Sequence, residues 1–471
     1  MNNNLHSDLV VIGAGPGGYA AAFRASDLGK KVILIDKNNT LGGVCLNHGC
    51  IPSKALLHIT KIINDAQSLN HLGITFPTPK LNIDKIRTWK NDVIQKLSKG
   101  ISSLANARNV QIICGNATFS SDSQLIIEMK DETKTITFND CIIATGSHSI
   151  SIPNIPNDHP KIIHSKEALE LKEIPKRLLI IGGGYIGLEM GTVYNALGSH
   201  VSVVEFMESI LPGADKDLVN PLAEKLHETF EDIFLSTRVS RIEPSNNDLI
   251  VHFESKNKTD YTKPFDMILI SVGRMPNTSK IGLENTGVSI DENGFILVNE
   301  KLKTNIQHIY AIGDVTGNPM LAHKATHEGK IAAEVICNQP SALDTTIIPA
   351  VIFTDPEIAW VGPTEDELNK SGILYEKGEF PWNASGKAIA INRTEGKTKL
   401  LFNPKNKKII SAGIVGPNAG DLIGEAVLAI EMGANVEDIA LSIHPHPTLS
   451  ETIGNAAEMF LGTITDLYVP K

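Results

Sequence analysis

The sequence is short of cysteine, of basic charge and of long apolar runs, and each shortage excludes a class of protein. Five cysteines in 471 residues are too few for a disulfide-stabilised scaffold. A net charge of −10 leaves no basic stripe that could follow a nucleic-acid backbone. No uninterrupted apolar run reaches the ~18 residues that a membrane-spanning helix requires. Residues 1–8 are short and polar, without the features of a targeting peptide, so we expect a cytoplasmic enzyme.

The first part of the chain carries the pattern of a dinucleotide-binding unit, within a length that predicts about three domains. A buried strand over 8–12 runs into a glycine-rich turn, an alanine-rich helix that ends at Gly29, and a second strand over 32–35. A GxGxxG turn between strand and helix lets a pyrophosphate approach the backbone, and an acid after the second strand binds an adenosine ribose. The residues in these positions are Gly13, Gly15, Gly18 and Asp36.

The same unit recurs later in the chain with the same spacing and without a gap. Its counterparts are Gly182, Gly184, Gly187, Gly198 and Glu205. Two such units predict two bound dinucleotides. Glu205 can accept a ribose 2′-hydroxyl but would repel a 2′-phosphate, and residues 206–208 supply no arginine to neutralise one. We therefore expect NAD rather than NADP at the second unit.

Between the two units, Cys45 and Cys50 stand in a stretch bracketed by glycines. A zinc site would favour a tighter C-x2-C spacing and a second ligand pair, which the sequence lacks. Two cysteines on one helical turn can bring their sulfurs within disulfide reach, and a helix after Cys50 would favour its thiolate. We interpret the pair as a redox-active disulfide, with a purely structural bridge as the alternative. Cys114, Cys141 and Cys337 lie in apolar stretches and are expected to be reduced core residues.

A third stretch, about 277–346, contains a buried strand that ends in Gly313 and Asp314, followed by a helix from about residue 320. An acid in this position is often a cap or turn residue. Asp314 could instead bind cofactor hydroxyls, and we expect this stretch to fold back onto the first unit.

The last third of the chain has strand-like runs and a helix over 420–432 but no glycine fingerprint. Its chemical signal is His444-Pro445-His446, with Glu451 close behind. The spacing leaves three interpretations open. The histidines could be packed or surface imidazoles, they could bind a metal, or a carboxylate could fix the tautomer of a basic imidazole.

Taken together, these residues resemble the flavin disulfide oxidoreductases (class I pyridine nucleotide-disulfide oxidoreductases), and within them the dihydrolipoamide dehydrogenases, over essentially the whole chain. The matching stretches are 42–54, the second glycine unit with Glu189, 311–314, 320–330 and 446–448. The resemblance implies an α/β fold with two Rossmann-like dinucleotide-binding domains, for FAD and NAD, and an α+β dimerisation domain. The expected boundaries are 1–150 for the FAD domain with its redox disulfide, 151–276 for the NAD domain, 277–346 for a segment completing the FAD domain, and 347–471 for the interface domain.

The resemblance also implies roles for individual residues. Cys50 would lie against the flavin as a charge-transfer thiolate, and Cys45 would exchange with the substrate sulfur. His446, supplied by the partner subunit, would deprotonate the dihydrolipoyl thiol, with Glu451 orienting it.

The same resemblance implies the cofactor contacts and no metal ligand. Lys54 would sit near the flavin, paired with Glu189. The expected contacts of FAD are Gly13, Gly15, Gly18, Asp36, Lys37, Gly43, Val44, Lys54, Ala117, Thr145, Gly146, Asp314 and Ala322. The expected contacts of NAD are Gly182, Gly184, Gly187, Glu205, Val239 and Gly273.

The implied activity is the oxidation of protein-bound dihydrolipoamide to lipoamide with reduction of NAD⁺. The implied partners are a second copy of the chain and the acyltransferase core of 2-oxo acid dehydrogenase complexes. We expect the lipoyl arm to come from a partner, because no lipoyl domain precedes residue 1. One alternative is another FAD-dependent disulfide or metal-ion reductase, similar to glutathione reductase or to mercuric reductase, although residues 466–471 lack the cysteine pair of the latter. The other is a non-catalytic assembly component, against which Cys45, Cys50 and His446 argue.

Three residues depart from the family pattern. Asp36 stands where a glutamate is more usual, but its carboxylate should still reach a ribose. Tyr185 replaces a small aliphatic residue, and we hypothesise that it gates the nicotinamide pocket. His48 stands between the two cysteines, where a cation would stabilise thiolate; a solvated surface histidine is the alternative.

Overall fold

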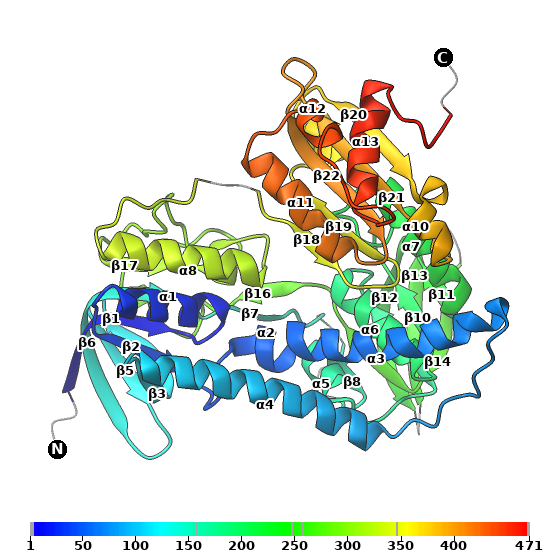
Figure 1. The fold of residues 1–471 in the computed structure, drawn as a ribbon. Helices are drawn as coiled ribbons and strands as arrows, with labels where there is room; N and C mark the ends of the chain where they lie inside the picture. The colour runs from blue at the N-terminus through cyan, green and yellow to red at the C-terminus, as the bar shows by residue number, and fades with distance from the viewer. Residues whose placement is uncertain are drawn as a thin grey trace.

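The computed structural model describes residues 4–153, 155–156, 158–245, 248–256, 259–344 and 347–468. Figure 1 shows an N-terminal unit in blue and cyan, a green unit beside it, and a yellow-to-red C-terminal unit above both. The predicted boundary at residue 346 and the last three residues of the predicted C-terminal end, 469–471, lie outside the described residues. Within the described parts of the chain, no helix is long and apolar enough to cross a membrane.

The first sheet is built mainly from parallel strands whose apolar side chains are buried on both faces, as expected where helices cover the faces. Strand order is β3-β2-β1-β6-β5-β4, with β1, β2, β3 and β6 parallel. The first strand begins at Asn4, earlier than the predicted residue 8. The elements are β1 (Asn4–Ile12), α1 (Pro16–Asp27), β2 (Val32–Asp36), α2 (Gly43–His48), α3 (Cys50–Ser68), η1 (Leu69–Leu72), α4 (Ile83–Ala107), β3 (Gln111–Cys114), β4 (Asn116–Ser121), β5 (Gln124–Glu128) and β6 (Thr133–Ile143).

The third stretch of the chain returns to this first sheet, as predicted. Strand β17 pairs in parallel with β6, and Figure 1 shows α8 lying along α1. A Cβ on Gly329 of α8 would lie 2.4 Å from the carbonyl oxygen of Gly17, so the two helices pack with their backbones in close approach. The elements of this stretch are η2 (Leu283–Asn285), β17 (Ile309–Ala311), η3 (Gly313–Thr316) and α8 (Ala322–Ile336).

The second sheet repeats the strand–helix–strand start of the first. Strands β9 and β10 are parallel and enclose helix α6, in a sheet of order β11-β10-β9-β15-β8. A separate antiparallel sheet, β12-β13-β14, lies against it. The elements are β7 (Ser147–Ser149), β8 (Ile162–His164), α5 (Ser165–Glu170), β9 (Arg177–Ile181), α6 (Tyr185–Ala196), β10 (His200–Val204), α7 (Lys216–Thr229), β11 (Asp232–Phe234), β12 (Thr237–Ser245), β13 (Asp248–Ser255), β14 (Tyr261–Phe265), β15 (Met267–Ile270) and β16 (Arg274–Pro276).

The C-terminal unit is an antiparallel sheet of order β18-β19-β22-β21-β20 covered by helices. Its core includes Trp382, Phe380 and Phe402, all fully buried. The elements are β18 (Ala350–Ile352), β19 (Glu357–Val361), α9 (Glu365–Lys370), β20 (Glu376–Pro381), η4 (Trp382–Ala384), α10 (Gly386–Ala390), β21 (Lys397–Phe402), β22 (Ile409–Gly416), α11 (Ala419–Glu431), α12 (Val436–Ala440) and α13 (Glu451–Leu461).

The prediction that three cysteines are core residues is wrong for two of them. Cys141 is fully buried in β6, but Cys114 and Cys337 are only half-buried. Cys114 ends the edge strand β3 and Cys337 follows the last turn of α8, and an edge and a helix end leave one side open to water.

Candidate active site

The two cysteines meet where helix α2 breaks and α3 begins. Gly49 separates the helices, and the sulfurs of Cys45 and Cys50 lie 2.6 Å apart, both as free thiols. The Cys45 thiol donates to Cys50, which raises the pKa of Cys45. The same hydrogen bond, together with the positive charge of Lys54, lowers the pKa of Cys50. The pair is therefore asymmetric: Cys50 favours the thiolate and Cys45 keeps the proton.

Lys54 is held beside the cysteines by a buried carboxylate. Its ammonium on α3 donates to both oxygens of Glu189 on α6, at 3.0 and 2.9 Å, and the Glu189 side chain is only 4% exposed. Glu189 also accepts the backbone N–H of Phe353 at 3.1 Å, and the Lys54 ammonium lies 4.4 Å from the centre of the Phe353 ring. The predicted Lys54–Glu189 pair is present, and Phe353, which the sequence did not single out, completes it.

The hypothesis that His48 supplies a cation to the sulfurs is not supported. Burial, and then the nearby charge of Lys166, lower the pKa of His48, which favours its neutral form. His48 lines a groove of about 460 Å³ between α2, α4 and α5, together with Lys90 and Lys166. The cation that lowers the pKa of Cys50 is Lys54.

The first glycine turn leaves open space at its middle glycine. Gly13 has a φ of +103°, and a Cβ there would lie 2.2 Å from the carbonyl oxygen of Ala144. A Cβ on Gly18 would lie 1.8 Å from the carbonyl oxygen of Gly13, so α1 packs directly onto the turn. Gly15 meets nothing within 4 Å, which leaves room for a pyrophosphate beside the backbone. A Cβ on Gly43 would lie 2.6 Å from the Gly15 Cα, so the start of α2 lies against the same turn.

The polar residues predicted around this turn lie at the ends of the strands of the first sheet. Asp36 ends β2, and its carboxylate accepts the backbone N–H groups of Ala14 and Asn38, both at 2.8 Å. The other predicted contacts are Lys37 after β2, Gly43 and Val44 at the start of α2, Thr145 and Gly146 after β6, and Ala322 at the start of α8. Ala117 differs, because its side chain is buried in the core beneath β4 and leaves only its backbone to contact a ligand.

Asp314 is connected to Arg274 through the hydroxyl of Ser147. Its carboxylate accepts the Ser147 hydroxyl at 2.5 Å, and Nε of Arg274 donates to the same hydroxyl at 2.7 Å. The sequence did not single out Ser147 or Arg274. Their signal was indirect: Ser147 follows the predicted turn at Gly146, and Arg274 follows the predicted turn at Gly273.

A cavity of about 1160 Å³ contains most residues of the predicted second nucleotide site. Its lining includes Gly182, Gly184, Glu205, Val239 and Gly273. Gly184 meets nothing within 4 Å, as at Gly15 in the first turn. A Cβ on Gly187 would lie 2.4 Å from the carbonyl oxygen of Gly182, so this glycine serves helix packing instead of lining the cavity. The matching geometry of the two turns is what two dinucleotide sites require.

Two side chains set the character of this cavity. The Glu205 carboxylate is buried and accepts the backbone N–H groups of Gly183 at 2.6 Å and Met207 at 2.7 Å. Tyr185, the first residue of α6, also lines the cavity and is 41% exposed. Tyr185 is thus placed where the hypothesis of a gate requires it.

The two histidines of the C-terminal motif do not converge on a common ligand. Nδ1 of His446 lies 2.8 Å from Oε1 of Glu451, whose other oxygen accepts the backbone N–H of Thr448 at 2.6 Å. His444 pairs separately with Glu425 at 2.7 Å. Because a carboxylate only accepts, the proton of His446 lies on Nδ1 and Nε2 is left as the base. Of the three interpretations left open by the spacing, the structure has the His–Glu pair.

The histidine motif is not joined to the cysteines within one chain. The His446 side chain is 78% exposed, and within the described residues no hydrogen bond or ion pair links it to Cys45 or Cys50. An exposed base far from the disulfide that it would serve fits a site completed by a second copy of the chain.

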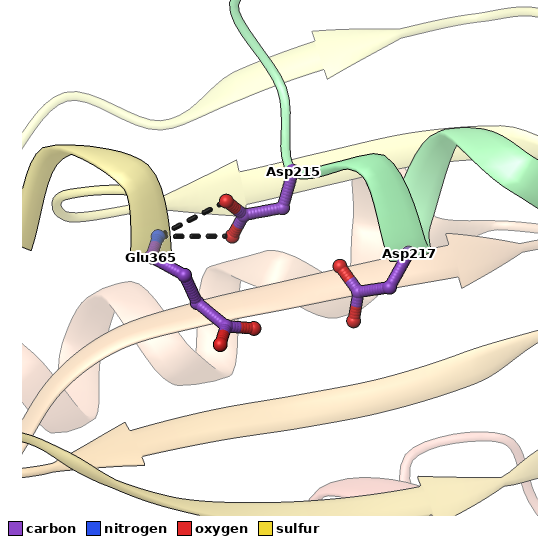
Figure 2. A group of neighbouring side chains, drawn as sticks. All are labelled: Asp215, Asp217 and Glu365. Carbon is purple, nitrogen blue, oxygen red and sulfur yellow. Dashed lines mark hydrogen bonds between the residues drawn. The ribbon is translucent and has the colours of Figure 1, made fainter. Parts of the chain in front are cut away.

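A cluster of three carboxylates was not predicted from the sequence. Asp215, Asp217 and Glu365 place oxygens close enough together to hold a cation, and Figure 2 shows both oxygens of Asp215 accepting the backbone N–H of Glu365, at 3.0 and 3.3 Å. The cation is the ammonium of Lys399, which lies 2.7 to 2.8 Å from an oxygen of each carboxylate. The cluster joins the green unit to the C-terminal unit through an internal ion pair.

Comparison with known proteins identifies the family. The pyridine nucleotide-disulphide oxidoreductase family matches residues 7–329, and its dimerisation domain matches residues 348–457. The chain belongs to the pyridine nucleotide-disulphide oxidoreductases. The predicted α/β fold, the enzyme class and the cofactors FAD and NAD are thereby confirmed, and the chain carries this family's dimerisation domain.

Several relatives within the pyridine nucleotide-disulphide oxidoreductases match over nearly their whole length. Dihydrolipoyl dehydrogenase of Buchnera aphidicola subsp. Schizaphis graminum is 51% identical over 99% of this chain and 98% of its own. The Haemophilus influenzae enzyme of the same name is 48% identical with the same coverage. Among solved structures, LpdA from Mycobacterium tuberculosis has a TM-score of 0.88 at 25% identity, covering 96% of this chain and 99% of its own. The flavoprotein disulfide reductase RclA from Escherichia coli, as a Cu(II) complex, has a TM-score of 0.86 at 28% identity, covering 98% and 100%.

Proposed function

We propose that this chain is a dihydrolipoyl dehydrogenase, which oxidises dihydrolipoamide to lipoamide and reduces NAD⁺ to NADH. The predicted activity is confirmed by relatives of that name at 47–51% identity over almost the whole chain. The observation that carries the proposal is the asymmetric cysteine pair beside Lys54. A thiol poised as thiolate next to a protonated partner is what a reversible disulfide relay needs.

The residues present fit the two cofactors. Gly15 and Gly184 both leave open space at the turn where a pyrophosphate would approach, while the glycines around them allow no side chain. We assign the first turn, with Asp36 and Asp314, to FAD, and the large cavity with Glu205 to NAD. FAD held at the first turn would supply an acceptor for the electron pair of the dithiol, and NAD⁺ held beside Glu205 would supply the final acceptor.

The protein's own chemistry in this reaction is thiol–disulfide exchange. In the oxidised enzyme, Cys45 and Cys50 form a disulfide. The substrate thiolate attacks the Cys45 sulfur, forms a mixed disulfide and releases Cys50 as a thiolate, which Lys54 stabilises. The second thiol of the substrate then attacks the first substrate sulfur, which is bonded to Cys45 in the mixed disulfide. Lipoamide leaves, and Cys45 is released as a thiol. The substrate has lost two electrons and the cysteine pair has gained them.

His446 and Glu451 supply the proton transfer in this scheme. Nε2 of His446 takes the proton from the attacking dihydrolipoyl thiol, and Glu451 stabilises the imidazolium that forms. Because His446 is exposed and is not joined to the cysteines of its own chain, we assign it to the disulfide of the partner subunit in a homodimer. We also propose the following domain boundaries. The FAD domain comprises 1–150 with 277–346, the NAD domain comprises 151–276, and the dimerisation domain comprises 347–471.

We further propose the cellular setting. The substrate would be the lipoyl group of a partner protein in a 2-oxo acid dehydrogenase complex, whose acyltransferase core the dimer would bind. We propose a cytoplasmic location for the enzyme.

An anaerobic titration of the purified holoenzyme tests the proposal. Dihydrolipoamide should produce a long-wavelength absorption band as Cys50 is released as a thiolate, and NAD⁺ should clear this band while NADH forms. The variant C45S should lose the response to dihydrolipoamide. If dihydrolipoamide leaves the spectrum unchanged while NADH or NADPH reduces the wild type, the enzyme is a reductase of some other disulfide or acceptor.

A further inference from the structure

The second nucleotide site contains a cation that local sequence did not indicate. Arg238 in β12 lines the same cavity as Glu205, although residues 206–208 supply no arginine. The strand that carries it lies against the acid: the backbone N–H of Thr237 donates to the carbonyl oxygen of Glu205 at 3.0 Å. The wall beside the ribose-binding acid therefore holds a guanidinium, the group that binds a phosphate most readily in a two-point contact.

Arg238 is engaged by a carboxylate of the neighbouring strand. It lies directly opposite Glu254 in the β12–β13 pair, and both its Nε and its terminal nitrogen donate to Oε2 of Glu254, at 2.7 and 2.5 Å. Glu254 lines the cavity too, and this hydrogen bond lowers its pKa, so it remains charged. The guanidinium fork is thus occupied inside the cavity.

We propose that Glu254 is a specificity-determining residue: by engaging Arg238, it withholds a cation of this wall that could bind a 2′-phosphate. Glu205 and Glu254 then both disfavour the binding of NADP, in different ways. Glu205 repels a 2′-phosphate directly, and Glu254 removes the group that would compensate it. The inference rests on the proposed function insofar as that function places a dinucleotide at Glu205.

The Arg238–Glu254 pair lies at the surface, so the fold does not depend on it. The side chains of Arg238 and Glu254 are 61% and 38% exposed, and ion pairs exposed to water contribute little to folding. Removing the Glu254 charge should therefore free Arg238 without unfolding the sheet. A second Arg–Glu pair on the same strand provides a matched control: Arg241 donates to Glu243 at 2.7 Å, and neither residue lines the cavity.

The test compares two small ligands that differ only in the 2′-phosphate, 5′-AMP and adenosine 2′,5′-bisphosphate. Their dissociation constants for the FAD-loaded enzyme are measured by calorimetry, and kcat/KM is measured for NAD⁺ and NADP⁺. In E254Q we expect the bisphosphate to bind about tenfold more tightly relative to 5′-AMP, as a charge-assisted contact from a freed guanidinium would provide. The ratio of kcat/KM for NADP⁺ to that for NAD⁺ should rise in the same direction.

Three results would overturn the inference. The first is no gain for the bisphosphate in E254Q. The second is a gain that persists in the double variant E254Q/R238A. The third is an equal gain in E243Q, which removes the same charge outside the cavity. Binding of 5′-AMP by the wild type separates this failure from that of the proposed function. If 5′-AMP binds and E254Q gains nothing, only the role of Glu254 is wrong; if the wild type binds neither ligand, the nucleotide site and this inference are wrong together.

Discussion

Replacing Lys399 with methionine would keep the length of the side chain and remove its charge from the centre of the carboxylate cluster. The ammonium lies 2.8 Å from Asp215, 2.7 Å from Asp217 and 2.7 Å from Glu365, and the Lys399 side chain is only 2% exposed. The variant would leave Asp215 without its ammonium partner, while Glu365 would keep Lys377 at 3.3 Å and Asp217 would keep Lys397 at 3.9 Å. Removing one partner of a buried ion pair costs about 3–5 kcal/mol, because the remaining charge is uncompensated.

The pH dependence of this loss follows from the direction of the pKa shifts. Burial raises the pKa of Glu365, but hydrogen bonds from Lys399 and Tyr375 and the charges of Lys399 and Lys377 outweigh it and lower the pKa to about 2. A carboxyl group whose pKa is lowered on folding stabilises the protein above its unfolded pKa, ~4.3, and loses that contribution as the pH falls toward about 2. The difference between K399M and the wild type should therefore be fully present above about pH 4.3 and shrink between that pH and about pH 2.

Urea unfolding followed by circular dichroism, at fixed protein concentration and with FAD bound, measures this difference. Lys407 provides the control, since its 2.6 Å pair with Glu376 is exposed and K407M should change the free energy of unfolding by about 1 kcal/mol or less. A loss in K399M no greater than in K407M, or one that does not depend on pH, would refute the reasoning.

Three further predictions concern the proposed active site and its support. In K54M the pKa of the Cys50 thiol should rise, because the positive charge of Lys54 beside it is lost. A pH titration of the thiolate absorbance of the reduced enzyme would show this upward shift, and an unchanged midpoint would contradict the role of Lys54. In H446Q, kcat/KM for dihydrolipoamide should fall by about 10²–10⁴ with FAD content unchanged, and steady-state rates near those of the wild type would exclude His446 as the base. The hydrogen bond to Glu425 raises the pKa of His444, so E425Q should lose stability below the unfolded histidine pKa of ~6.5 and match the wild type once the pH exceeds the raised value, as urea unfolding at pH 5.5 and pH 9 would show.

Much of the fold was predictable because its signals are local. The two glycine turns, the acids that follow them and the paired cysteines each lie within about one supersecondary unit, so spacing along the chain carries the information. The same holds for the end of β6 at Ile143, where an apolar run is followed by Thr145 and Gly146.

Contacts between residues far apart in the chain were not predictable from local patterns. Lys399 stands in the run Lys397-Thr398-Lys399, where alternating lysines suggest an exposed strand, yet its side chain is buried by carboxylates from another unit. Arg238 and Glu254 face each other only through the register of β12 and β13, which no local pattern specifies. The Lys54–Glu189 contact, on which the asymmetry of the cysteine pair depends, was predicted only through the resemblance to the family and not from local spacing.

The contacts of Glu189 have a consequence for recombining this chain with its relatives. One buried carboxylate of α6 holds the lysine next to the cysteines and, through the backbone N–H of Phe353, the strand that leads into the C-terminal unit. A chimera that exchanges any one of the three units therefore cuts through this junction, even when the crossover lies in a surface loop. Crossovers should be chosen so that Lys54, Glu189 and the segment at Phe353 come from parents with the same three residues; otherwise the hybrid inherits a buried charge without its partner.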